Sequence, residues 1–147
     1  MQLFFAQQDI DKKMCKRALK IAIKFIKEKY PNTPIHKDLK ITFSNKVETK
    51  TKRFETSMWY QGHRIDIRLK ESMTMYKLKT AGRTAPKGRL HIGKELIATV
   101  HLIHEITHHI QDIEGRYMSE TETTMNEIDF FRVNYRKIYN KLTIVKA

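Results

Sequence analysis

Between Lys94 and Ile113 the chain runs without a glycine or a proline, and this segment constrains the fold more than any other. Apolar residues recur in it at the spacing of one helix face: Leu96, Val100, Ile103, Ile106, Ile110 and Ile113. Gly93 and Gly115 flank the segment as natural boundaries. The sequence therefore predicts a helix from Lys94 to Ile113 that buries one face.

The same helix contains His104-Glu105-Ile106-Thr107-His108, an H-E-x-x-H motif. Residues four apart lie one above the other on a helix face, so both imidazoles can approach one metal ion from outside the apolar arc. Glu105 beside them can take a proton from a water on the metal. Zinc lowers the pKa of such a water toward ~7, from ~16 in bulk. The motif predicts Zn²⁺ as cofactor and hydrolysis with Glu105 as general base.

A catalytic zinc ion usually has three protein ligands and one open position. Ser119 can cap a second helix, which the apolar spacing extends to about Asn140. Glu122 lies in the first turn of that helix and Asn126 one turn later on the same face. Glu122 is therefore the preferred third ligand.

Other roles and other carboxylates compete at this position. Ser119 and Glu122 also form a capping-box pattern, which would engage Glu122 with its own backbone. Glu114 lies where metzincins have their third ligand, but Gln111 replaces the glycine that breaks their helix. Glu120 and Glu127 are disfavoured because they point away from the Glu122 face.

H-E-x-x-H followed by Glu122-Thr123-Thr124-Met125-Asn126 resembles the gluzincin metallopeptidases, and the small ImmA/IrrE-like members look most similar. Their third ligand is a glutamate in an E-x-x-A-N/D pattern, and Met125 stands where alanine is usual. The resemblance covers roughly residues 60–133. It implies a zinc metalloendopeptidase in which His104, His108 and Glu122 bind zinc and Glu105 is the base.

Further polar residues near the motif are candidates for supporting roles. Asn126 and Asp129 can hold the ligand imidazoles through their second nitrogen. His101, one turn before His104, can support the site or touch substrate, whereas His109 borders the apolar arc and reads as a packed histidine. An oxyanion donor is expected as well, and its candidates are Tyr117, Arg116, Tyr135 and Arg132.

The remaining elements complete an α+β chain that we expect to form one zincin-like metallopeptidase domain over residues 1–147. A helix begins at Asp9 or Asp11 and ends near Tyr30. Three strands follow, at Leu39–Phe43, Phe54–Tyr60 and Arg64–Leu69, with a turn at Gln61-Gly62. The order is N-terminal helix, small three- or four-stranded sheet, H-E-x-x-H helix and C-terminal ligand helix. Arg64–Leu69, or a strand at Leu90–Ile92, would pair with extended substrate at the sheet edge.

Composition limits the partners and the compartment. The chain has 29 Lys and Arg against 16 Asp and Glu, a net charge of +13, which attracts polyanions or acidic partners. The basic loop from Lys70 to Lys94 is predicted to hold acidic substrate or nucleic acid, with an ordinary solvated surface as the alternative. Cys15 is the one cysteine, as suits a reducing cytoplasm. The apolar run Leu3–Ala6 is too short to enter a membrane, and no membrane partner is expected.

Two other functions compete with a peptidase acting on a protein or peptide. One is a basic nucleic-acid-binding module with a zinc site, which no helix-turn-helix, zinc-finger or stacking-aromatic pattern supports. The other is a peptidase recruited by nucleic acid, as in SprT-like proteins, whose third ligand is a downstream histidine. No histidine follows His109, so the peptidase reading is preferred.

Overall fold

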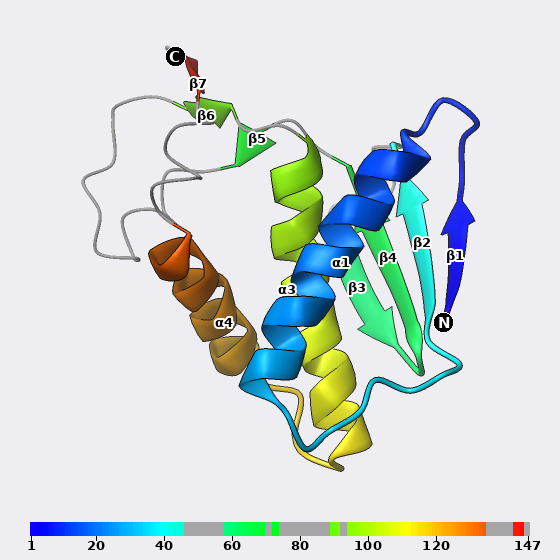
Figure 1. Ribbon diagram of the computed structural model, residues 1–147, viewed down its shortest axis with the longest axis vertical. Coiled ribbons are helices and arrows are strands. Elements are labelled where there is room, and N and C mark those ends of the chain that lie inside the picture. Colours follow the sequence, from blue (N-terminus) through cyan, green and yellow to red (C-terminus); the bar gives the residue numbers. More distant parts are fainter. Residues whose placement is uncertain (46–57, 70–71, 74–88, 92–93, 135–142, 146–147) are drawn as a thin grey trace, which may run out of the picture.

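The computed structural model describes residues 1–45, 58–69, 72–73, 89–91, 94–134 and 143–145. Within these ranges, three helices and two sheets form an α+β fold (Figure 1). The elements in chain order are β1 (Gln2–Phe5), α1 (Lys12–Lys29), β2 (Lys40–Ser44), β3 (Met58–Gln61), β4 (Arg64–Arg68), β5 (Ser72–Met73), β6 (Arg89–His91), α3 (Lys94–Ile113), α4 (Glu120–Val133) and β7 (Thr143–Val145). Most of the predicted basic loop, 70–94, lies outside the described residues.

The larger sheet has the order β1-β2-β4-β3, in which β1, β2 and β4 run parallel and β3 is antiparallel to β4. The turn between β3 and β4 is formed by Gly62 and His63, with positive φ angles of 51° and 62°. Two successive positive φ angles match the twist of a tight hairpin, and glycine adopts the first of them without strain. The predicted turn at Gln61-Gly62 is therefore confirmed, one residue further along.

The strands differ from the sequence analysis in two respects: one strand was missed, and the predicted substrate-pairing strands do not lie at an edge. β1 was not predicted, because four residues carry too little alternation to be recognised. The proposed substrate-pairing strands are both central: β4 lies between β2 and β3, and β6 lies between β5 and β7. Their backbone edges are thus already paired, so neither can accept an extended substrate.

The first helix agrees with its sequence signals. The Asp11 side chain accepts a hydrogen bond of 3.0 Å from the backbone N–H of Met14, as an N-cap should, and Tyr30 is the C-cap. The spacing of its apolar residues predicts a buried stripe of Met14, Ala18, Ile21, Ala22 and Phe25, and this prediction is partly right. Met14, Ala18 and Ala22 are buried, whereas Ile21 is 45% exposed because the buried stripe passes instead through Cys15, Leu19 and Ile26.

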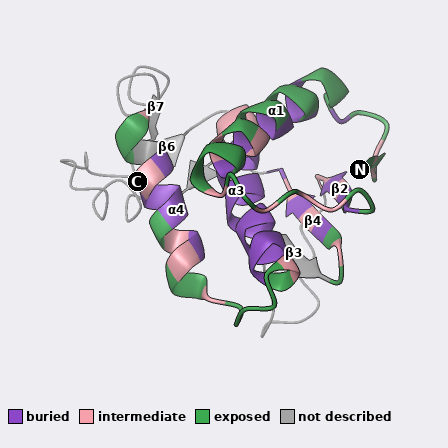
Figure 2. Cartoon of the chain, turned by 60° about the horizontal axis from the view of Figure 1, so that its bottom comes forward, coloured by how far each residue is buried: buried purple, intermediate pink, exposed green. Residues whose placement is uncertain are grey.

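α3 is the central element of the molecule, and it packs against α1, α4 and the larger sheet (Figure 1). Every residue from 97 to 111 is buried, as Figure 2 shows for this helix. The prediction of a helix from Lys94 to Ile113 is confirmed, but that of a single buried face was wrong, since α4 covers the polar side as well. No helix in the described parts is long and apolar enough to cross a bilayer.

α4 begins after the Ser119 cap as predicted, but it ends at Val133 rather than near Asn140. Asn134 is its C-cap, and both its backbone N–H and its side-chain amide donate to the carbonyl of Phe130. The apolar spacing of this segment predicts a buried stripe of Met125, Ile128, Phe131, Tyr135, Ile138 and Leu142. Ile128 is buried as predicted, whereas Met125 is 45% exposed, and Tyr135, Ile138 and Leu142 lie outside the described residues. The buried face of α4 instead includes Thr123, Asn126, Glu127 and Phe130.

Candidate metal centre

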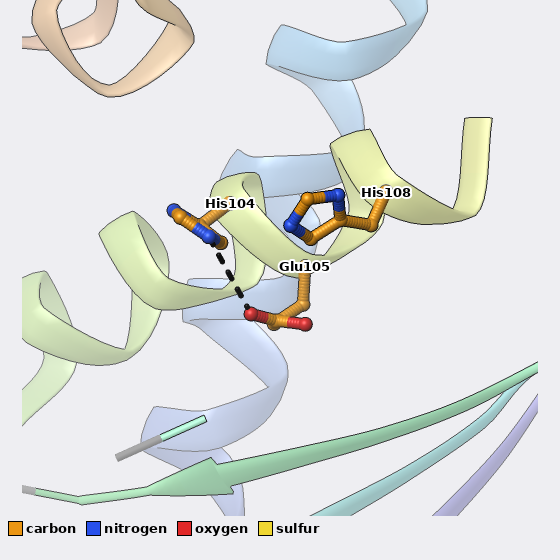
Figure 3. Close-up of side chains that lie close together, drawn as sticks. All are labelled: His104, Glu105 and His108. Carbon is orange, nitrogen blue, oxygen red and sulfur yellow. Dashed lines mark ion pairs between the residues drawn. The ribbon is translucent and has the colours of Figure 1, made fainter. Parts of the chain in front are cut away.

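The H-E-x-x-H motif lies in the middle of α3, on successive turns (Figure 3). The ring centroids of His104 and His108 are 5.1 Å apart, as expected for residues four apart on a helix. His104, Glu105 and His108 each offer a ligand atom within 4.8 Å of the others. The structure therefore brings together the three motif residues that the sequence singled out, as a group that could hold a metal ion.

The motif residues are buried, which is costly for ionisable groups unless they have partners. The exposed fractions of His104, Glu105 and His108 are 8%, 3% and 6%. Their partners are carboxylates from α4 and from the helix itself. The site is thus a closed cluster of imidazoles and carboxylates between two helices.

Glu120, the first residue of α4, joins the two histidines. Its two carboxylate oxygens lie 3.0 Å from Nε2 of His104 and 2.8 Å from Nε2 of His108. The side chain is 73% exposed, so it closes the cluster from the solvent side. Glu120 was disfavoured in the sequence, yet it is the carboxylate that reaches both imidazoles.

His108 is oriented through its other nitrogen by Gln111. The distance from His108 Nδ1 to Gln111 Oε1 is 2.9 Å. Gln111 also accepts from the backbone N–H of Ser119 and donates to its carbonyl, both at 3.1 Å, which fixes the direction of its amide. An amide oxygen accepts hydrogen bonds, so Nδ1 of His108 is engaged by Gln111, and Nε2 is the nitrogen that faces Glu120. Sequence reasoning missed this role, although the i, i+3 spacing from His108 was visible.

His104 is surrounded by three carboxylates. Its Nδ1 lies 3.5 Å from Glu127, and its Nε2 lies 3.7 Å from Glu105 in addition to Glu120 (Figure 3). Burial by itself would lower the pKa of His104, but the interaction with Glu127 and the charges of Glu105 and Glu120 raise it overall. The pocket therefore favours positive charge at His104.

Glu105 has a strongly perturbed carboxyl group. Burial, aided by the charges of Glu120 and Glu127 and opposed by His104, raises its pKa to about 7. Its Oε2 atom is buried and has no hydrogen-bond partner among the described residues. A buried carboxylate oxygen of this kind beside two imidazoles fits a cation, since two nitrogens and several oxygens are a donor set that zinc accepts.

Glu122, the predicted third ligand, is engaged elsewhere. Its carboxylate accepts hydrogen bonds from Arg116 at 2.7 and 3.1 Å and from the Tyr30 hydroxyl at 2.5 Å. The Arg116 hydrogen bonds, with that of Tyr30, lower the pKa of Glu122 to about 2 despite its partial burial. Half of the capping box forms: the Glu122 N–H donates to Ser119 Oγ at 3.2 Å.

The remaining predicted residues lie around the site rather than in it. Asn126 is buried and donates to Thr107 and to Tyr30, not to a motif imidazole. Asp129 pairs with Lys29. The prediction that these two residues hold the imidazoles is therefore not met.

The other candidates named from the sequence can also be placed. Tyr117 is 95% exposed in the connection between α3 and α4, and Arg116 pairs with Glu114 and Glu122. Glu114, the metzincin-type rival, is thereby engaged away from the motif. His101 is 7% exposed, so it is buried within α3. Tyr135 lies outside the described residues.

A second histidine cluster lies elsewhere around α3. His109 is fully buried, and its Nε2 accepts a hydrogen bond of 3.0 Å from the backbone N–H of His36. The ring of His63 stacks on His36 at 4.3 Å and meets His109 edge-on at 5.4 Å. Burial, with the neighbouring histidines, lowers the pKa of His109 to about 4. The prediction of a packed histidine with one satisfied nitrogen is confirmed.

Comparison of the chain with protein families, with curated proteins and with solved structures found no match. The geometry and chemistry of this site are therefore the basis for its function.

Proposed function

We propose that the chain is a zinc-dependent metallopeptidase that hydrolyses a peptide bond in a protein or peptide substrate. The observation that carries the proposal is that buried His104, Glu105 and His108 lie together and that Glu120 contacts both histidines from the solvent side. Residue types, spacing and burial all match an H-E-x-x-H hydrolase site. The packing of α3 between the sheet and α4 is also the arrangement expected of a zincin-like core.

His104 and His108 would hold zinc through their Nε2 atoms, because Gln111 engages the other nitrogen of His108 and both Nε2 atoms converge on Glu120. Glu120 is the best-placed carboxylate for the third position, since it already contacts both nitrogens. Glu122 remains its rival on the strength of the sequence pattern. To reach the histidines, Glu122 would first have to leave Arg116 and Tyr30.

Zinc, when bound, would supply an acidified water and polarise the scissile carbonyl. Glu105 is the residue that would hold and pass the proton, because its carboxylate faces His104 and its second oxygen is unsatisfied. Burial raises the pKa of this carboxyl to about 7. A pKa near neutral pH suits a group that must both accept and release a proton.

Glu105→Gln is the direct test. The amide keeps the shape of the side chain but cannot accept the proton, so we expect zinc content to be unchanged and cleavage to fall by roughly 10²–10⁴-fold. Cleavage is measured by mass spectrometry on an unbiased peptide mixture with zinc-loaded protein. The matched control is Glu114→Gln. This substitution makes the same chemical change at the residue directly after α3, where the carboxylate pairs with Arg116 and not with the motif. Equal activity of Glu105→Gln and wild type would refute the role of Glu105.

A further inference from the structure

The two faces of the larger sheet differ sharply. Ile41, Phe43, Ile65 and Ile67 point into the core that α1 and α3 complete, and all four are buried. The alternate residues of β2 and β4 point the other way, where Lys40 and Arg64 are exposed. On β1, Phe4 is 46% exposed. No described helix covers this second face, which we call the open face.

The strand register arranges the open face in rows. Lys40 is opposite Arg64, and in the next row Phe4 is opposite Thr42, which is opposite Asp66. These residues surround a hollow of about 440 Å³, lined by Phe4, Lys40, Thr42, Arg64, Ile65 and Asp66. The aromatic ring and the two cations thus border one depression on the sheet.

A second hollow continues the first toward the start of β1 and the β3–β4 turn. Its volume is about 670 Å³, and it shares Lys40 and Arg64 with the first. Its other lining residues include Lys37, Asp38 and His63. The two hollows therefore adjoin, and the shared cations lie where they meet.

The charge of this surface is positive. The surface carries four cations and two carboxylates: Lys37, Lys40, Arg64 and Arg68, and Asp38 and Asp66. Asp66 lies between the two arginines, whose charges act against the rise in its pKa that burial causes, and Thr42 hydrogen-bonds to it. The whole chain has a net charge of +13, so a polyanion approaching this face is attracted at long range as well.

We propose that the open face of the sheet is a binding surface for single-stranded nucleic acid, with a base stacked on Phe4 and phosphates held by Lys40 and Arg64. Exposed aromatics on a sheet, flanked by cations, bind unpaired bases without sequence readout. A duplex keeps its bases stacked on one another and would leave the Phe4 ring unused. This surface lies across the sheet from α3, so it stands independently of the proposed peptidase site.

Fluorescence anisotropy tests the proposal with a labelled oligonucleotide of about 12 nucleotides, at about 0.15 M salt and over a salt series. Reversing two phosphate contacts with Lys40→Glu and Arg64→Glu should weaken binding at least ~20-fold and flatten the salt dependence by roughly 1.4 in slope. The matched control is Lys20→Glu with Lys24→Glu, which makes the same charge change on the exposed side of α1. Equal weakening by both pairs would mean diffuse attraction and would overturn the assignment.

Phe4 provides the second arm. Phe4→Leu retains an apolar side chain but removes the ring, and we expect about a tenfold loss of affinity for the single strand, with Phe4→Trp retaining it. An unchanged affinity in Phe4→Leu would refute stacking. His104→Ala should bind the oligonucleotide as wild type does, whatever becomes of the zinc site.

Two other polyanions serve as competitors. Poly-L-glutamate represents an acidic protein, and vesicles of phosphatidylcholine with phosphatidylglycerol represent a membrane surface. If either binds the open face while the oligonucleotide does not, the nucleic-acid proposal is wrong.

Discussion

Two histidine groups around α3 have the same residue type and opposite surroundings. His104 and His108 face carboxylates, and those carboxylates raise the pKa of His104. His109 faces His36 and His63, and its pKa is lowered to about 4. His104, His108 and His109 are all buried residues of α3, so burial does not distinguish them. The neighbouring groups determine the direction of the pKa shift. Carboxylates favour positive charge at His104, whereas a backbone N–H and other imidazoles favour the neutral form of His109.

The largest difference should appear in metal content. His104→Ala or His108→Ala should reduce zinc affinity by more than the ~100-fold that loss of an outer hydrogen-bond partner costs. His109→Gln should bind zinc as wild type does, because that residue lies in the other group. Zinc stoichiometry by elemental analysis and affinity by chelator competition measure this. Normal zinc binding by the double variant His104→Ala, His108→Ala would place the metal elsewhere.

The second test compares the two carboxylates of α4's first turn. Glu120→Ala should weaken zinc binding by orders of magnitude, because it removes the group that contacts both Nε2 atoms. Glu122→Ala should mainly destabilise the fold, by about 1–3 kcal/mol, because Arg116 and Tyr30 lose their acceptor. Zinc affinity and Tm are measured for both variants. The opposite pattern would restore Glu122 as the third ligand.

A smaller effect should follow from loosening His108. Gln111→Leu removes the amide that engages Nδ1 of His108 while keeping a side chain of similar size. We expect zinc affinity to fall by about 10–100-fold. Asp112→Leu, at the next and exposed position of α3, is the control. If both variants bind zinc equally well, Gln111 does not orient His108 for the metal, and its role is limited to its hydrogen bonds with the backbone of Ser119.

The last prediction concerns the pH dependence of stability and the second histidine group. His109 has a folded-state pKa of about 4 against 6.5 for the free side chain, so the fold favours its neutral form. Its contribution is fully present above about pH 6.5 and is lost as the pH falls through about 4, by up to roughly 3 kcal/mol. Denaturant titrations at each pH measure the free energy of unfolding. The informative quantity is wild type minus His109→Gln, since other groups titrate in both proteins; a flat difference would contradict the shift.

Local signals in the sequence predicted much of the fold. The limits of α3 followed from the absence of breakers between Gly93 and Gly115, and Gly115 indeed has a positive φ of 67° at the helix end. Asp11 marked the start of α1, because its side chain can cap the first turn of a helix. The motif residues were predicted because a spacing of four determines their relation on any helix.

The third carboxylate could not be predicted in the same way. Whether Glu120 or Glu122 reaches the histidines depends on the angle and rotation at which α4 crosses α3, and these are set by packing along the whole helix. Phe130, which the apolar spacing leaves out of the predicted stripe, is buried there, whereas Met125, which the spacing includes, is exposed. Asn126 and Glu127 are polar residues on the buried face of α4. The spacing of apolar residues alone therefore does not identify the face that α4 buries.

Glu120 has an exposed side chain and is the first residue of α4, whereas the imidazoles it contacts belong to the most buried helix. Terminal helical turns fray with little free energy, while the middle of a buried helix opens only with the whole fold. The two halves of the cluster therefore belong to parts of the molecule with very different opening rates. Exchange of a cation would follow the fraying of one turn, and its rate would be set at Ser119 and Glu120 rather than by global unfolding.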